Sequence, residues 1–180
     1  MDFGTSIKGI ESSVGGAGKA FPEAKGYQGV ILKAEDKYSS KGTPMMVLTV
    51  DIADGQFKGF FEGKGLIYQT YGNDIGKSIL KGIIETAQKE NPANIVGADF
   101  TATGFNEQKL VGCKVGLVLD WKWSEKHSKY FLNPGFICPA DKALERVAKE
   151  RPIAGPNGEP IIERGATGSA STKAADDLPF

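Results

Sequence analysis

The sequence has few of the residues from which catalytic and metal sites are built. It contains one histidine and two cysteines in 180 residues. His127 lies in a lysine-rich stretch without a partner that would indicate a catalytic triad or a metal set. Cys113 and Cys138 are too few for a disulfide framework or a zinc site, so we expect two small buried apolar residues in a reducing cytoplasm. Because the carboxylates are also scattered singly, without a two-metal cluster, the sequence favours a protein that is not an enzyme and has neither a metal ion nor a cofactor.

Long apolar runs and an excess of positive charge are also lacking. No segment approaches the ~20 apolar residues of a membrane helix, and the first residues lack the pattern of a secretory signal, so we expect a cytoplasmic protein. Lysine plus arginine and aspartate plus glutamate number 22 each, which gives a net charge of zero. A protein that grips phosphates by charge alone would be basic throughout. Any nucleic-acid site here must therefore be a local groove in which aromatic stacking shares the work.

One glycine-rich stretch resembles part of a phosphate-binding loop. In Gly15–Ala20 the first glycine of that motif would fall at Ser13, and Ala20 replaces its metal-binding serine or threonine. No hydrophobic strand precedes it. We therefore interpret residues 1–20 as a flexible N-terminal arm.

The composition divides the rest of the chain into one domain and a tail. Residues 21–151 are long enough for a single hydrophobic core. Residues 152–175 are rich in glycine, proline, alanine, serine and threonine, and their one apolar patch cannot offset the entropy cost of ordering. We predict a disordered linker here, with a root-mean-square span of roughly 30 Å.

Apolar residues alternate with polar ones in five segments of the domain, which predicts five strands. In the first, Val30, Leu32 and Ala34 would share one face. Asp54-Gly55 is a signal for a type I′ hairpin between the second and third. The predicted strands are Tyr27–Asp36, Met45–Ala53, Gln56–Phe61, Lys114–Trp123 and Lys129–Cys138.

A change of period between the third and fourth strands predicts the main helix. Apolar residues recur at helical spacing there; they are Ile75, Ile79, Leu80, Ile83, Ile84 and Ala87. Asn73 or Asp74 would cap the start of this helix, and Asn91-Pro92 would end it. Asp141 would cap a second, short helix that runs to about Lys149.

Three strands, a helix and two further strands are the layout of the OB-fold, a five-stranded Greek-key barrel whose ligands lie across strands two and three. The predicted class is therefore mainly β, a five-stranded OB-fold barrel with a helix between strands three and four and flexible termini. A small α+β sandwich of the same elements is the competing architecture. In the barrel, the loops Lys37–Pro44 and Ser124–Ser128 would clasp the ligand.

These two loops interleave lysines with aromatic residues, as a site for stacked bases and their phosphates requires. On the third predicted strand, Phe60 would point outward between Lys58 and Glu62, while Phe57 and Phe61 would enter the core. The candidate DNA-binding residues are Lys37, Tyr38, Lys41, Lys58, Phe60, Trp121, Lys122, Trp123, Lys126, Lys129 and Tyr130.

For some of the aromatic residues a packing role competes with base stacking. With a tight turn, Trp121 would lie opposite Tyr130 across the last hairpin as one aromatic platform. Trp121 and Trp123 also share the face of apolar strand residues. The alternative to base stacking is therefore that one or both of them close the end of the barrel. We expect Tyr68 and Tyr71, just before the helix, to pack beneath it.

The last five residues, Asp176, Asp177, Leu178, Pro179 and Phe180, combine an acidic pair with an aromatic ring beside the free α-carboxylate. Such a peptide can place its ring in a pocket of a partner while its carboxylates meet arginine or lysine. The ending resembles the C-terminal tip of bacterial single-stranded-DNA-binding proteins, Asp-Asp-(Ile/Leu)-Pro-Phe, which recruits replication, recombination and repair enzymes in that family. Gly42–Leu48 and Leu110–Gly116 look more like phage-encoded relatives. The departures from the housekeeping members leave a homo-oligomer open and prevent transfer of their stacking residues.

The resemblance implies a sequence-tolerant single-stranded-DNA-binding protein of a bacterial cell or a phage-infected host. The barrel would protect the strand, and the tip would recruit replication and recombination proteins, with no role at a membrane. One alternative is an adaptor of the same machinery that binds no DNA. A third hypothesis is a nucleic-acid-processing enzyme with an unrecognised site. The sequence does not distinguish DNA from RNA.

Overall fold

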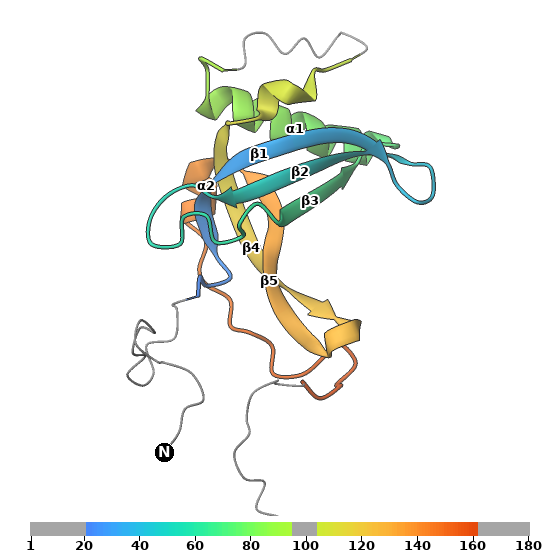
Figure 1. The fold of residues 1–180 in the computed structure, drawn as a ribbon, viewed down its shortest axis with the longest axis vertical. Helices are drawn as coiled ribbons and strands as arrows, with labels where there is room; N and C mark the ends of the chain where they lie inside the picture. Colours follow the sequence, from blue (N-terminus) through green and yellow to red (C-terminus); the bar gives the residue numbers. More distant parts are fainter. Residues whose placement is uncertain (1–20, 95–103, 162–180) are drawn as a thin grey trace, which may run out of the picture.

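The computed structural model describes residues 21–94 and 104–161. Three predicted segments lie outside these ranges: the flexible N-terminal residues 1–20, the linker beyond residue 161, and the tip Asp176–Phe180. Five strands form one antiparallel sheet in the order β3-β2-β1-β4-β5, with one main helix, α1, so the predicted mainly β class is confirmed (Figure 1). The strands are β1 Gly26–Tyr38, β2 Pro44–Ile52, β3 Gly65–Thr70, β4 Lys114–Ser124 and β5 Lys129–Cys138.

The two edge strands, β3 and β5, approach each other at one point. A Cβ atom on Gly65 would lie 3.0 Å from Cγ of Pro134 on β5 and 2.5 Å from the carbonyl oxygen of Val50. Glycine therefore permits this close approach. No hydrogen-bonded ladder joins β3 to β5 in the described ranges, so the sheet is not closed.

The core lies between the inner face of the sheet and helix α1, Asp74–Glu90. As predicted, Asn73 caps the helix, its Oδ1 accepting a hydrogen bond from the Gly76 amide at 2.8 Å, and Asn91 ends it. Only one stripe of the helix faces the core, and it contains Ile83, Ile84 and Ala87. Of the predicted apolar stripe, Ile75 and Ile79 are instead 74% and 49% exposed, because they lie outside the part of the helix that covers the core.

The pairing of β1 with β2 shifts register between Ile31 and Lys33. This bulge reverses the alternation that the sequence predicts, since a bulged residue occupies a position without a direct partner. Ile31 and Ala34 are both fully buried, whereas Leu32 is 44% exposed. The predicted shared face of Val30, Leu32 and Ala34 is therefore wrong.

The third strand is not at Gln56–Phe61, and Asp54-Gly55 does not form a tight hairpin. Residues 53–64 form a loop instead, and β3 follows it. The reason is Asp51 on β2, which is buried and whose carboxylate accepts hydrogen bonds from the amides of Ile52 at 2.8 Å, Phe61 at 3.0 Å and Gly63 at 3.2 Å. These bonds fold the loop back over the end of β2, and positive φ angles at Gly55, Gly59 and Gly63 permit its turns.

The predicted second helix is shorter than expected. Helix α2 spans Ala140–Leu144 and begins after Pro139, without a side-chain cap from Asp141. Lys149, the predicted end, pairs as an isolated bridge with Ala24. The two remaining short elements are 3-10 helices, η1 at Glu107–Leu110 and η2 at Glu125–His127.

The ends of β1 and β3 are linked by the Tyr71 hydroxyl, which donates a hydrogen bond to the Asp36 carboxylate. Burial and this neighbouring carboxylate raise the pKa of Tyr71 from 10.0 to about 12. The raised value means that the protonated phenol stabilises the fold below about pH 10, and that this stabilisation is lost as the pH rises through about 12.

We therefore expect an alkaline titration, followed by phenolate absorbance, to contain a step near pH 12. The Tyr71→Phe variant should lack this step, and Asp36→Asn should move it to lower pH because the nearby negative charge is removed. A step that persists unchanged in Tyr71→Phe would assign it to another tyrosine.

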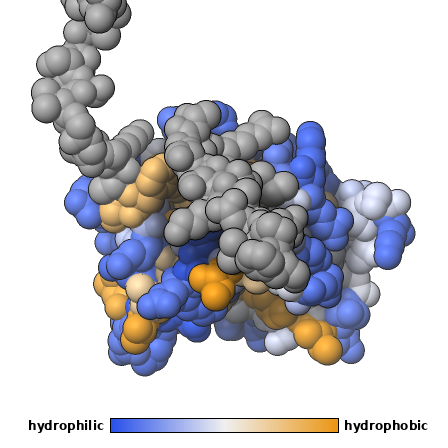
Figure 2. Space-filling model, turned by 90° about the horizontal axis from the view of Figure 1, so that it is seen from below, coloured by the Kyte–Doolittle hydropathy of each residue, from blue (hydrophilic) through white to orange (hydrophobic). Residues whose placement is uncertain are grey.

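On the face seen from below, hydrophobic side chains form separate patches among hydrophilic ones (Figure 2). In residues 21–94 and 104–161, no helix combines the length and apolar character needed to cross a membrane.

Candidate functional site

The hairpin of β4 and β5 extends beyond the rest of the sheet (Figure 1). β1 pairs with β4 only at Lys114–Val118, so from Leu119 onward β4 is paired with β5 alone. The β4–β5 register also shifts at Val118/Leu119, opposite Gly135, which bends the hairpin at its base. We call residues 119–134 the arm; its tip is the turn that contains η2.

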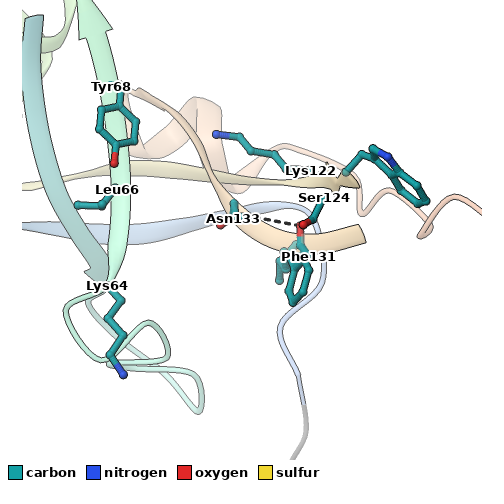
Figure 3. Close-up of a pocket in the computed structure, with 9 residues that line it drawn as sticks. Lys64, Leu66, Tyr68, Lys122, Ser124, Phe131 and Asn133 are labelled. Atoms are coloured by element: carbon teal, nitrogen blue, oxygen red, sulfur yellow. Dashed lines mark hydrogen bonds between the residues drawn. The ribbon is translucent and has the colours of Figure 1, made fainter. Parts of the chain in front are cut away.

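A groove of about 520 Å³ lies between β3 and the arm (Figure 3). Lys64, Leu66 and Tyr68 come from the β3 side, and the other residues come from the arm. Two lysines and three aromatic residues line the groove, and no carboxylate does. The full lining is Lys64, Leu66, Tyr68, Lys122, Trp123, Ser124, Phe131, Leu132 and Asn133.

The aromatic rings of the groove are accessible from both of its sides. Tyr68 is 59% exposed on β3, and Phe131 is 38% exposed on β5. The Lys129 ammonium lies 4.8 Å from the centre of the Phe131 ring, within cation–π range. Asn133 donates a hydrogen bond to the Phe131 carbonyl at 3.2 Å, which leaves the polar end of this side chain beside the ring.

The arm pairs its aromatic residues differently from the prediction. Trp123, not Trp121, lies opposite Tyr130, and the ring centres are 5.1 Å apart. The turn between Ser124 and Lys129 is longer than the tight turn assumed in the prediction. The pairing of β4 with β5 is therefore shifted by two residues. Trp121 pairs with Leu132 instead, and its indole N–H donates to the Lys149 carbonyl at 3.1 Å. Trp123 therefore borders the groove, but its ring lies with Tyr130 on the face of the arm opposite Lys122 and Phe131, whereas Trp121 is engaged by the chain after α2.

The pairing of β1, β2 and β3 shows which residues lie beside the groove on the outer face of these three strands. Directly paired residues share a face of a sheet, and Tyr68 on β3 is in line with Val47 on β2 and Glu35 on β1. Lys33 and Lys37 flank Glu35 on this face, so lysines occur on β1 as well as in the groove.

Glu35 holds both of its lysine neighbours in ion pairs. Its carboxylate lies 2.9 Å from the Lys33 ammonium and 3.1 Å from that of Lys37. Hydrogen bonds to these two cations lower the pKa of Glu35 from its usual value, so the carboxylate stays ionised at neutral pH. The lysines of β1 are thus partly neutralised, as is Lys64 of the groove lining, whose ammonium lies 3.5 Å from the Glu62 carboxylate.

The structure brings only part of the predicted site together. Lys122 and Trp123 line the groove, Lys129 contacts the ring of Phe131, and Tyr130 contacts the ring of Trp123. Exposed residues of three other segments lie outside the lining: Tyr38 and Lys41 at the β1–β2 turn, Lys58 in the 53–64 loop, and Lys126 in the arm tip. The β1–β2 turn and the arm tip stand well apart in Figure 1.

Phe60 is not the outward-pointing strand residue that the sequence predicts. It lies in the 53–64 loop, where its ring contacts those of Phe61 at 5.1 Å and Phe21 at 5.9 Å and packs against the core. The cause is the loop held by Asp51, in which residues no longer alternate between two faces. Lys58, which was also predicted on the third strand, lies in the same loop.

Sequence reasoning missed the groove residues on the β3 side because it placed the third strand too early. Tyr71 packs against the core as expected, but Tyr68 does not pack beneath α1 and instead faces the groove. The signal that identifies it is the alternation from Gly65 to Thr70, in which Ile67 is buried and both neighbours are less so. The other missed residues are Lys64 and Leu66 on the β3 side and Ser124, Phe131, Leu132 and Asn133 on the arm.

Across residues 21–94 and 104–161, no three histidine, cysteine, aspartate or glutamate side chains are grouped so that they could hold a metal ion. No protein-family model matches the sequence, and a search of curated proteins finds no match either.

Proposed function

We propose that this protein binds single-stranded DNA without sequence preference and protects it during replication, recombination or repair. The observation that carries the proposal is the groove, which combines the exposed rings of Tyr68 and Phe131 with two lysines and has no carboxylate in its lining. Aromatic rings stack on any base because every base has a π-face, and ammonium groups neutralise the phosphates. Double-stranded DNA does not offer its bases for such stacking. This chemistry binds a strand and requires no reaction step.

We further propose that the sheet is an OB-fold barrel left open at one seam. The strand order β3-β2-β1-β4-β5, with β3 brought next to β5 at Gly65 and Pro134, supports this topology. The main helix lies between strands three and four, as is common in that fold, and its ligands lie across strands two and three. The outer face described above includes those two strands, and the groove borders it at β3.

The resemblance of Asp176–Phe180 to the tip of bacterial single-stranded-DNA-binding proteins supports a second role, the recruitment of partner proteins. The acidic pair and the terminal ring would bind a basic, apolar pocket of a replication or recombination protein. The phage-like stretches of the chain support a phage or prophage origin. The groove and the tip lie in separate parts of the sequence, so strand binding and recruitment are separable.

The proposal is tested by titrating fluorescent oligonucleotides, single- and double-stranded, across a salt series. We expect a preference for the single strand, an affinity that falls with salt, and a change of tryptophan fluorescence as the strand fills the groove beside Trp123. Equal binding of both forms, or no binding at low salt, would overturn the proposal. Absence of binding together with capture of a replication protein through the tip would support the adaptor alternative.

Deletion of Asp176–Phe180 should abolish the recruitment of partners and leave the affinity for oligo-dT equal to or slightly higher than that of the full chain. The reason is that the deletion removes two carboxylates and leaves every groove residue in place. Pull-down of replication proteins and fluorescence anisotropy measure the two effects. Weaker strand binding by the truncated chain would mean that the tip is part of the DNA site.

Glu35→Gln should strengthen strand binding, because it frees Lys33 and Lys37 from the ion pairs on the outer face. Each lysine that gains a phosphate adds about 0.7 to the slope of log K against log salt, so the slope should steepen by up to about 1.4. Glu85→Gln, the same charge change in a surface ion pair on α1, is the matched control. Equal slopes in the two variants would exclude β1 from the strand path.

A further inference from the structure

Two side chains of the arm tip contact Phe131, the exposed ring on the β5 side of the groove (Figure 3). The Lys129 ammonium lies 4.8 Å from the centre of this ring. The His127 imidazole meets the ring in a T-shaped contact, with ring centres 5.6 Å apart and planes inclined at 71°. His127, the single histidine of the chain, does not line the groove itself, yet it touches a ring that does.

A tight turn at Ser128 brings His127 and Lys129 to the same ring. Ser128 has φ 45° and ψ 46°, in the left-handed region that residues with a side chain rarely occupy. Its amide donates to the Glu125 carbonyl at 3.3 Å, directly after the short helix η2. The chain reverses here, so the residues before and after Ser128 both reach Phe131. Backbone strain of this kind persists where the surrounding structure holds it, and it clusters at ligand-binding sites.

The arm tip carries more positive than negative charge. Within residues 21–94 and 104–161, no ion pair involves the lysines of the arm, which are Lys122, Lys126 and Lys129. The Asp120 carboxylate at the base of the arm is paired with Lys149. The charged residues on the elements that meet at the tip are therefore Glu125 and Lys126 on η2, Lys129 on β5 and Lys122 on β4. A polyanion that approaches His127 meets mainly cations.

We propose that His127 and Lys129 form a phosphate-binding subsite beside the base that stacks on Phe131, and that protonation of His127 strengthens the binding of the strand. The inference rests on the proposed function, because the subsite has a ligand only if a strand enters the groove. A stacked base carries backbone phosphates on both sides of its sugar, so cations that touch the ring lie beside the strand. Neutral imidazole donates one hydrogen bond to a phosphate oxygen, and imidazolium adds a positive charge.

Protonation and strand binding are linked in both directions. Imidazole ordinarily titrates between about pH 5 and 8, and if its protonation strengthens binding by some factor, binding must favour protonation by the same factor. We expect oligo-dT to bind about 2- to 5-fold more tightly at about pH 5.5 than at about pH 8, the effect of one further exposed ion pair. The titration midpoint of the His127 ring, followed by NMR, should rise by about 0.3–0.7 pH units in the complex. The gain is complete below the midpoint of the free protein and is lost as the pH rises through that of the complex.

The test measures the affinity of the full chain for oligo-dT by fluorescence anisotropy at constant salt, from about pH 5.5 to about pH 8. His127→Gln keeps a hydrogen-bonding side chain that cannot be protonated, so its affinity should lack the gain at low pH. His127→Lys has a permanent charge and should bind at high pH as tightly as the natural sequence does at low pH. The matched control combines His127→Gln with Ser78→His, which moves the imidazole to an exposed position on α1, far from the arm tip (Figure 1). It should behave as His127→Gln does.

The ring contact is tested without DNA. Phe131→Leu should shift the His127 imidazole signals, because the ring current of Phe131 is lost. Unchanged signals would mean that His127 does not rest on the ring, and the subsite would be rejected. The same pH dependence in His127→Gln as in the natural sequence would also overturn the subsite, while a retained preference for the single strand would leave the proposed function standing. If the natural sequence binds no oligonucleotide at any of these pH values, the proposed function fails and the subsite fails with it.

Discussion

Replacing Tyr68 and Phe131 together by alanine should weaken the binding of oligo-dT about 100-fold. The two rings face the groove from opposite sides and are 59% and 38% exposed, so each is available to a base. Stacking of one base on an aromatic ring contributes about 1–3 kcal/mol, and about 1.4 kcal/mol changes an affinity tenfold. Fluorescence anisotropy at constant salt measures the loss. Each single variant should account for about half of the free-energy change if the two rings hold different bases.

Two comparisons separate stacking from loss of structure. Tyr68→Phe keeps the ring and should bind nearly as tightly as the natural sequence, and the melting temperature of the double variant should stay close to the original because both rings are on the surface. Tyr38→Ala changes an exposed aromatic ring at the β1–β2 turn, outside the groove. If Tyr38→Ala abolished binding while the double variant had no effect, the strand would be bound at that turn and not in the groove.

Asp51→Ala should lower the free energy of unfolding by about 3 kcal/mol. The buried carboxylate of Asp51 accepts hydrogen bonds from three backbone amides, and bonds to a charged group contribute about 1.5–3 kcal/mol each before the released amides are hydrated by water. Without this acceptor the loop of residues 53–64 loses the bonds to Phe61 and Gly63 that fold it over the core. Urea denaturation monitored by tryptophan fluorescence measures the change.

Asp54→Ala provides the comparison for this stability effect. Asp54 is on the same loop, but its carboxylate is exposed and forms only a surface ion pair with Lys114 at 3.8 Å. Surface pairs of this kind contribute about 0–1 kcal/mol. Equal destabilisation by the two variants would show that the loop is not organised around Asp51.

The sequence predicts correctly where local pattern and tertiary structure agree. Strand β2 and helix α1 lie where alternation, capping and helix-ending residues place them, since Asn73 and Asn91 mark the helix ends by short-range chemistry. The third strand is different. Its position depends on a carboxylate that accepts from residues ten and twelve positions later, and no local pattern reveals that Asp51 is buried. The bulge at Leu32 likewise depends on the pairing partner of β1.

The candidate site could be predicted only in part for the same reason. Lys122 and Trp123 were identified because a lysine-rich turn between alternating strands indicates an exposed hairpin end. Tyr68 was missed because its strand was misplaced. Trp123, and not Trp121, pairs with Tyr130 because the turn between β4 and β5 is longer than a tight hairpin, and residue types alone do not determine that length. The tip Asp176–Phe180 lies outside the described residues, so its role stays a prediction.

The way in which the arm is joined to the rest of the sheet allows the arm to tilt. Beyond Val118 the strand ladder of β4 runs to β5 alone, and the bond from the Leu119 amide to the Lys25 carbonyl at 2.9 Å lies at the base of the hairpin, so a tilt of the hairpin about Gly135 breaks no ladder bond between β4 and β1. Such a tilt changes the separation between Phe131 and Tyr68, and hence the width available to a base. The fastening of Trp121 to Lys149 limits this hinge from the opposite side. Purines and pyrimidines, which differ in size, could thus be accommodated by one set of rings through adjustment of a single angle, without repacking of the core.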